Sequence, residues 1–204
     1  MNRCNLLCAK IVGWITNFTT QFNPADLGCL VTLLDNHNED ADVVTDICSI
    51  MYGIVTCGNI EAVIAAGFMK KMINLIQTLK VGKSDPDRVE EITDAAVATI
   101  NIAIASGNDA HIKCLVDISC IEVLCDFIAS CHSETFMRDS LETLEKILEF
   151  GAPCIDYARR IEKKIKSIHS SSWPRQVPFY FDEFLRKLDM YLGRSKRIDL
   201  KDLF

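Results

Sequence analysis

Apolar residues recur at steps of three and four positions along most of the chain, for example from Val43 to Ile54 and from Ile92 to Ile104. This spacing places the apolar side chains on one face of an α-helix. Gly, Asn, Asp and Pro interrupt the pattern at short intervals, which is too often for the long helices of a simple bundle. The pattern therefore predicts an all-α fold built from many short and medium helices.

Three segments with the same arrangement of apolar positions indicate an internal repeat. They are residues 30–34, 72–76 and 124–128. The second segment starts 42 residues after the first, and the third starts 52 residues after the second. A longer predicted helix follows each one, over 41–55, 88–106 and 134–150, and a fourth long helix is predicted over 4–19. Gly28 and Gly67 precede the first two copies, where we expect a sharp turn between helices. A period near 42 residues with three helices per unit favours an armadillo solenoid, and a non-repetitive helical bundle is the alternative.

Residues 96–107, 108–128 and 141–151 resemble the last two armadillo repeats of the importin-α family, and the likeness extends over about residues 10–151. The resemblance implies a right-handed superhelix of about four repeats over residues 1–154, followed by a divergent helical cap over 155–204. It also implies a protein-binding adaptor of nucleus and cytoplasm that takes Lys-rich peptides. The expected function is a non-enzymatic scaffold with a basic peptide or a dedicated protein as its partner.

The long third helices of that family present a Trp and, four residues later, an Asn toward the peptide. The matching positions here are Gly13 and Asn17, Ser49 and Gly53, Val97 and Asn101, and Glu142 and Lys146. None of them is Trp, although Trp14 lies one residue from the first, and only Asn17 and Asn101 keep the amide. Each missing Trp removes a cation–π contact with a Lys side chain that contributes about 0.5–2 kcal/mol. We therefore expect weakened binding of classical nuclear localisation signals, and a genuine import adaptor for basic cargo is the alternative.

The net charge of −6 divides unevenly, with −11 over residues 1–154 and +5 over residues 155–204. An acidic body disfavours nucleic acid and favours basic partners. No apolar run approaches the roughly 20 residues that span a bilayer, and the start of the chain lacks the features of a signal peptide. We therefore expect a soluble intracellular protein that has no membrane partner.

Ten cysteines occur without any CxxC pair. Several occupy apolar helical positions, which predicts reduced core thiols at Cys29, Cys48, Cys114, Cys120 and Cys125. The four histidines are far apart, and no metal-ligand spacing, phosphate loop or nucleophile motif is found. The sequence therefore predicts no catalytic residue, no metal and no cofactor.

The last 50 residues combine basic and aromatic character. Residues 159–166 form an amphipathic basic pattern, which predicts a cap on the last repeat or, alternatively, an anchor for an acidic surface. The aromatic and apolar positions that follow are Phe179, Phe181, Phe184, Leu188 and Tyr191. We expect this segment to pack on the repeats as a cap, or to serve as an interface for self-association in a structural component.

Overall fold

The computed structural model describes residues 24–38, 40–79, 86–131, 133–150, 154–166, 168 and 177–194. All regular structure in these ranges is helical, as the periodicity predicts. The helices are α2 (Pro24–Asn36), α3 (Ala41–Thr56), α4 (Ile60–Ala65), α5 (Phe68–Leu79), α6 (Pro86–Ser106), α7 (Asp109–Asp117), α8 (Cys120–Ser130), α9 (Glu134–Phe150), α10 (Cys154–Ile165) and α11 (Val177–Tyr191). The long helix expected over 4–19 lies outside the described residues.

Polar side chains define where two of the helices begin. The Asp40 carboxylate accepts a hydrogen bond from the Val43 backbone N–H at 3.4 Å and caps α3. Asn108 and His111 form a reciprocal capping box at the start of α7, in which the Asn108 side chain accepts from the His111 N–H at 3.0 Å. Each cap satisfies backbone N–H groups that the first helical turn leaves without partners.

Left-handed backbone makes the sharp turns between helices. Gly58 has φ +85° after α3, and its N–H donates to the Val55 carbonyl while the Asn59 N–H donates to the Ile54 carbonyl. This double pattern closes a helix end where a side chain would strain the backbone. Gly67 has φ +77° between α4 and α5, as expected for a turn. The same expectation is wrong for Gly28, which lies inside α2.

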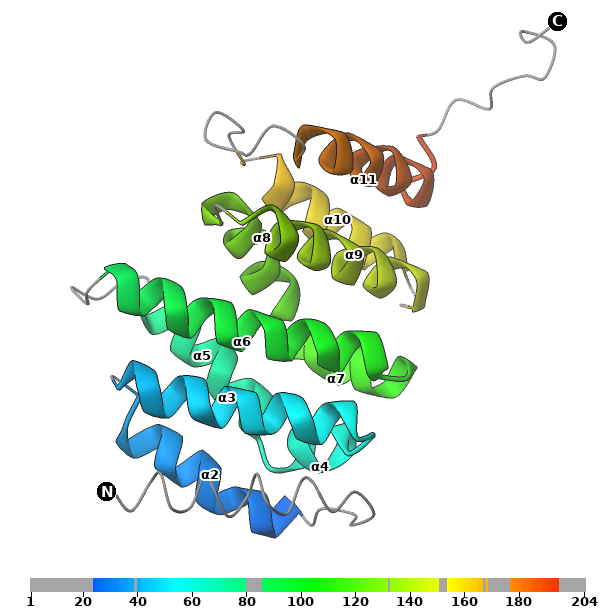
Figure 1. The fold of residues 1–204 in the computed structure, drawn as a ribbon. Coiled ribbons are helices and arrows are strands. Elements are labelled where there is room, and N and C mark those ends of the chain that lie inside the picture. The colour runs from blue at the N-terminus through cyan, green and yellow to red at the C-terminus, as the bar shows by residue number, and fades with distance from the viewer. Residues whose placement is uncertain are drawn as a thin grey trace, which may run out of the picture.

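The order short, medium, long occurs twice, in α4–α5–α6 and again in α7–α8–α9, and α2–α3 supply a medium and a long helix before them. Figure 1 shows the long helices α3, α6, α9 and α11 stacked one above the next. Contacts follow this order, since α3 packs on α6, α6 on α9, and α9 on α11. A second row runs through α5, α8 and α10, which also pack on their neighbours in turn.

The apolar faces of both rows meet in one continuous core. Its fully buried side chains include Ile47, Met72, Ile100, Leu124 and Leu144, so every unit contributes to it. The polar residues buried with them are few, and Thr99 donates its hydroxyl to the Ala95 carbonyl of its own helix at 2.9 Å. The core fixes the spacing of the long helices, and it thereby shapes the surface that they present.

Ion pairs join the C-terminal helices to the preceding unit. Arg160 of α10 contacts Glu122 of α8 through two guanidinium nitrogens, with distances of 2.8–3.1 Å. The Lys164 ammonium lies 3.1 Å from the Asp126 carboxylate one turn further along the same pair of helices. This register shows how the basic pattern of residues 159–166 is used: one of its faces meets acidic side chains of α8.

Candidate binding pocket on the long helices

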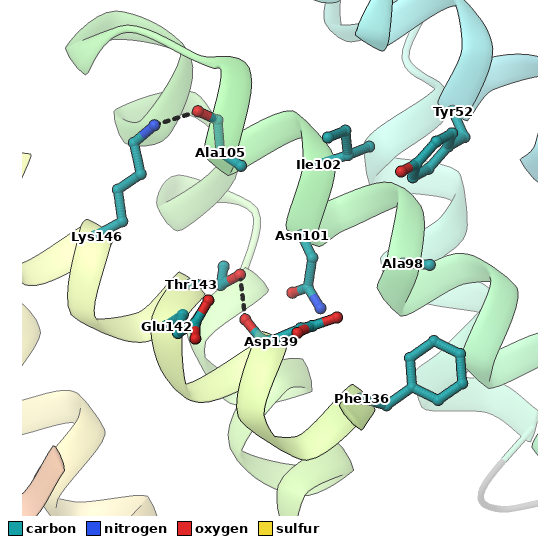
Figure 2. Close-up of a pocket in the computed structure, with 10 residues that line it drawn as sticks. All are labelled: Tyr52, Ala98, Asn101, Ile102, Ala105, Phe136, Asp139, Glu142, Thr143 and Lys146. Atoms are coloured by element: carbon teal, nitrogen blue, oxygen red, sulfur yellow. Dashed lines mark hydrogen bonds between the residues drawn. The ribbon is translucent and has the colours of Figure 1, made fainter. Parts of the chain in front are cut away.

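A pocket of about 450 Å³ opens on the row of long helices, between α3, α6 and α9. Figure 2 shows its lining side chains, which are Tyr52, Ala98, Asn101, Ile102, Ala105, Phe136, Asp139, Glu142, Thr143 and Lys146. Two aromatic rings, one amide, two carboxylates and one ammonium thus face one space. Such a mixture suits a peptide segment with both apolar and charged side chains.

Asn101 provides the polar group at the centre of the pocket, and Figure 2 shows its amide directed from α6 toward α9. The residue is only 9% exposed, and its Nδ2 lies 3.4 Å from the Ser140 hydroxyl oxygen. Its Oδ1 is buried and has no hydrogen-bond partner among the described residues. An unsatisfied buried amide oxygen costs on the order of 1–3 kcal/mol. The amide therefore has a capacity for hydrogen bonding that the fold itself leaves unused.

The charged side chains of the pocket come from α9. Asp139, Glu142 and Lys146 lie on successive turns, which places them along one edge of the helix. The Lys146 ammonium donates to the backbone carbonyl of Ala105, in the last turn of α6. A cation at this point satisfies a terminal carbonyl and interacts favourably with the helix dipole. Lys146 thus ties the end of α6 to α9.

Tyr52 and Phe136 form the aromatic part of the pocket. The Tyr52 side chain is 42% exposed, which is high for a large ring on a packed helix. Phe136 is held by an edge-to-face contact with Phe127, with ring centroids 6.4 Å apart and planes at 79°. One ring is therefore accessible from solvent, and the other is fixed against the core.

The predicted groove positions other than Val97 fall in three groups. Asn101, Glu142 and Lys146 line the pocket. Ser49 is exposed and Gly53 half-buried on α3, and neither is among the lining residues. Gly13, Trp14 and Asn17 lie outside the described residues.

The position assigned to Val97 is wrong, because its side chain is fully buried in the core. Its neighbour Ala98 lines the pocket instead. One residue rotates the direction of a side chain by about 100° around a helix. Apolar residues occur on both faces of α6, so the pattern alone did not define which one points outward.

Tyr52, Phe136 and Asp139 were not predicted as pocket residues. A signal for the first is present, since α3 and α6 are both followed by a Gly-Asn pair, at Gly58 and Gly107. Tyr52 and Asn101 each stand six residues before that glycine. Counting back from the turns would have placed the two side chains at equivalent positions.

The predicted C-terminal residues differ in burial along α11. Phe184 and Leu188 are buried, and Phe181 and Tyr191 are partly buried against the same core. Phe179 is 64% exposed. The helix packs on α9 and α10, so its inner face covers these two helices while Phe179 remains at the surface.

Burial decides the chemistry of the described cysteines. Burial raises the pKa of the Cys48 thiol to about 12, and burial together with the nearby Asp126 charge does the same for Cys125. Cys120 is buried as well, and its pKa is also raised. The prediction of core thiols is wrong for Cys29 and Cys114, which are exposed. A weakly polar thiol fits an apolar pattern without having to face the core.

No known protein family and no curated protein matches this chain. In the described ranges, no helix is both long and apolar enough to cross a membrane. The same ranges contain no group of three His, Cys, Asp or Glu side chains placed to hold a metal ion. The pocket and the arrangement of the helices are therefore the features that bear on function.

Proposed function

We propose that this chain is a protein-binding scaffold of armadillo type, an importin-α-like adaptor whose long-helix face binds an extended segment of a partner protein. Two observations support this proposal: the order short, medium, long occurs twice among the helices, and the long helices stack on one another. The observation that carries it is the pocket between α3, α6 and α9, with Asn101 at its centre. By analogy with importin-α adaptors, we propose that the protein is found in the nucleus and the cytoplasm.

The bound segment is expected to be basic. Asp139 and Glu142 attract cations, and the exposed Tyr52 ring offers a face on which the aliphatic stem of Lys or Arg packs. The Asn101 side chain lines the pocket, and its unused Oδ1 can accept a hydrogen bond from a peptide N–H when the amide turns toward the segment. No described groove position carries Trp, so a generic Lys-rich signal makes fewer stacking contacts than it does in importin-α. A dedicated partner adds contacts outside the pocket.

Titration of a fluorescent Lys-rich peptide by anisotropy tests the proposal. We expect a Kd of about 10–500 μM at low salt, which weakens as salt screens the carboxylates. Glu142→Gln and Asn101→Ala are expected to weaken binding. Glu61→Gln removes the same charge from an exposed site on α4, away from the pocket, and serves as the matched control.

Three results would change the conclusion. Submicromolar binding that Asn101→Ala abolishes would establish the alternative, a genuine import adaptor for basic cargo. Absence of binding at millimolar peptide, or equal effects of Glu142→Gln and Glu61→Gln, would remove the pocket as the binding site.

A further inference from the structure

The pocket on the long helices has two chemically different parts. One part presents carboxylates, an ammonium and an amide, on Asp139, Glu142, Lys146 and Asn101. The other part, which we call the slot, is lined by Tyr52, Ala98, Ile102 and Phe136. Figure 2 shows the Ala98 side chain between the two aromatic rings, on the side of the pocket away from Lys146. The pocket therefore offers a charged surface and an apolar surface to one bound segment.

Three helices contribute to the slot. Tyr52 of α3 forms one wall and is exposed, and Phe136 of α9 forms the opposite wall and is held by its edge-to-face contact with Phe127. Ala98 and Ile102 lie one turn apart on α6, and both are half-buried. Because the Ala98 side chain is a single methyl group, it leaves room between the rings that a larger residue would fill. The slot therefore fits a flat or branched apolar side chain, such as that of Phe or Leu.

An ammonium group is a poor fit for the slot. It carries three N–H donors, and burying a charged group without hydrogen-bond acceptors is costly. Among the four side chains of the slot, the Tyr52 hydroxyl is the one acceptor. A Lys of the bound segment is better placed with its ammonium near Asp139 and Glu142 and its aliphatic stem on the Tyr52 ring. The slot is then left for an uncharged neighbour in the same segment.

The charges of the pocket alone select basic segments weakly. The Arg138 guanidinium lies 3.6 Å from the Asp139 carboxylate and 3.8 Å from the Glu142 carboxylate. Together with Lys146, two positive charges therefore oppose two negative charges at this part of the pocket. Exposed ion pairs contribute less to affinity than the burial of a whole Phe or Leu side chain. Selectivity in this pocket therefore depends more on the slot than on charge.

We propose that the slot selects partner segments that carry one large apolar residue, Phe or Leu, close to their basic residues. This inference rests on the proposed function and names the class of segment that the pocket binds. Ala98 is the specificity-determining residue, because the size of its side chain sets how much room lies between Tyr52 and Phe136. Tyr52 has a second part in binding, since its ring is both a wall of the slot and a support for the Lys stem.

The test is a substitution scan of the Lys-rich peptide, built as a run of Lys flanked by Ala and measured by anisotropy. Phe replaces each Ala in turn, so the charge of the peptide stays constant. We expect Phe to tighten binding about five- to thirtyfold at one or two positions close to the Lys run, and by less than about twofold at the others. The gain is the ratio of the Kd of the all-Ala peptide to that of the best Phe peptide.

Variants of the protein assign the gain to the slot. Ala98→Leu fills the space between the rings and should reduce the gain to near one. Ala129→Leu makes the same change at an exposed site on α8, outside the pocket lining, and is the matched control that should keep the gain. Tyr52→Ser removes one wall without placing a larger side chain among packed residues, and it should lower the gain as well. Circular dichroism of each variant verifies that the fold is retained.

The outcomes separate this inference from the proposed function. A flat Phe scan, with the Lys-rich peptide still bound in a manner that Glu142→Gln weakens, would overturn the inference and leave the proposed function in place. A similar gain at every position of the scan would overturn it too, because it would show unspecific apolar attraction. A gain that persists in both Ala98→Leu and Tyr52→Ser would place the Phe outside the slot and have the same effect. Absence of binding by every peptide would overturn the proposed function and the inference together.

Discussion

Phe184 and Phe179 provide a paired test of how α11 is attached to α9 and α10. The two residues lie on the same helix, but Phe184 is 3% exposed and Phe179 is 64% exposed. Truncating a buried Phe to Ala costs about 3–5 kcal/mol, whereas a surface change away from special features stays within about 0.5 kcal/mol. Because both variants exchange Phe for Ala in α11, their difference measures burial rather than helix propensity.

Hydrogen exchange of the α11 amides is the appropriate assay, since a helix at the end of the described stack can open without the rest. A loss of 3–5 kcal/mol corresponds to roughly a hundredfold to a few thousandfold faster exchange, provided that the helix is stable enough to show the full loss. We expect this acceleration for Phe184→Ala and near wild-type exchange for Phe179→Ala. Equal exchange in both variants would refute the assignment of α11 as a helix held by its buried face.

Three further outcomes are expected. In the folded protein near pH 8, alkylation followed by mass spectrometry should find the exposed Cys57 modified and Cys125, whose pKa is raised to about 12, unmodified. Thermal melts should show the same melting temperature with and without reductant. Gly107→Ala should lower the free energy of unfolding in urea by about 1–3 kcal/mol, because the added Cβ would lie 2.7 Å from the backbone oxygen of Ala103. Gly28→Ala should raise it by about 0.5–1 kcal/mol, because Gly28 lies inside α2 with open space around the added Cβ. Hydrogen bonds from Arg194 and Lys166 lower the pKa of Glu162 to about 2, so the stabilising contribution of its carboxylate is complete above about pH 4.5 and is lost as the pH falls toward 2. Glu162→Gln should therefore speed hydrogen exchange at the end of α11 at pH 7. The difference from the wild type should shrink as acid protonates the wild-type carboxylate.

The fold was more predictable than the site because helices and pockets depend on different information. Apolar periodicity and its interruption by Gly, Asn, Asp and Pro are local, and they predicted the helix over 134–150 with the bounds that α9 has, and that over 41–55 within one residue of α3. The pocket depends on how three helices rotate against one another. Asn101 was found because it matches the position at which the importin-α family has an Asn, whereas Val97, matched in the same way, is buried and its neighbour Ala98 lines the pocket. Phe136 and Asp139 follow from the packing of α9 on α6, which no segment encodes alone.

The stacking of α3 on α6 and of α6 on α9 has a thermodynamic consequence for any partner that lies across them. Each layer opens with its own free energy, so an unoccupied array has several weak points. A ligand in contact with three layers binds only while all three are closed, and it adds RT ln(1 + [L]/Kd) to the free energy needed to open any of them. The partner then couples layers that are otherwise linked only through neighbour contacts, and occupancy of the pocket becomes measurable as slowed exchange in a helix that the partner does not touch.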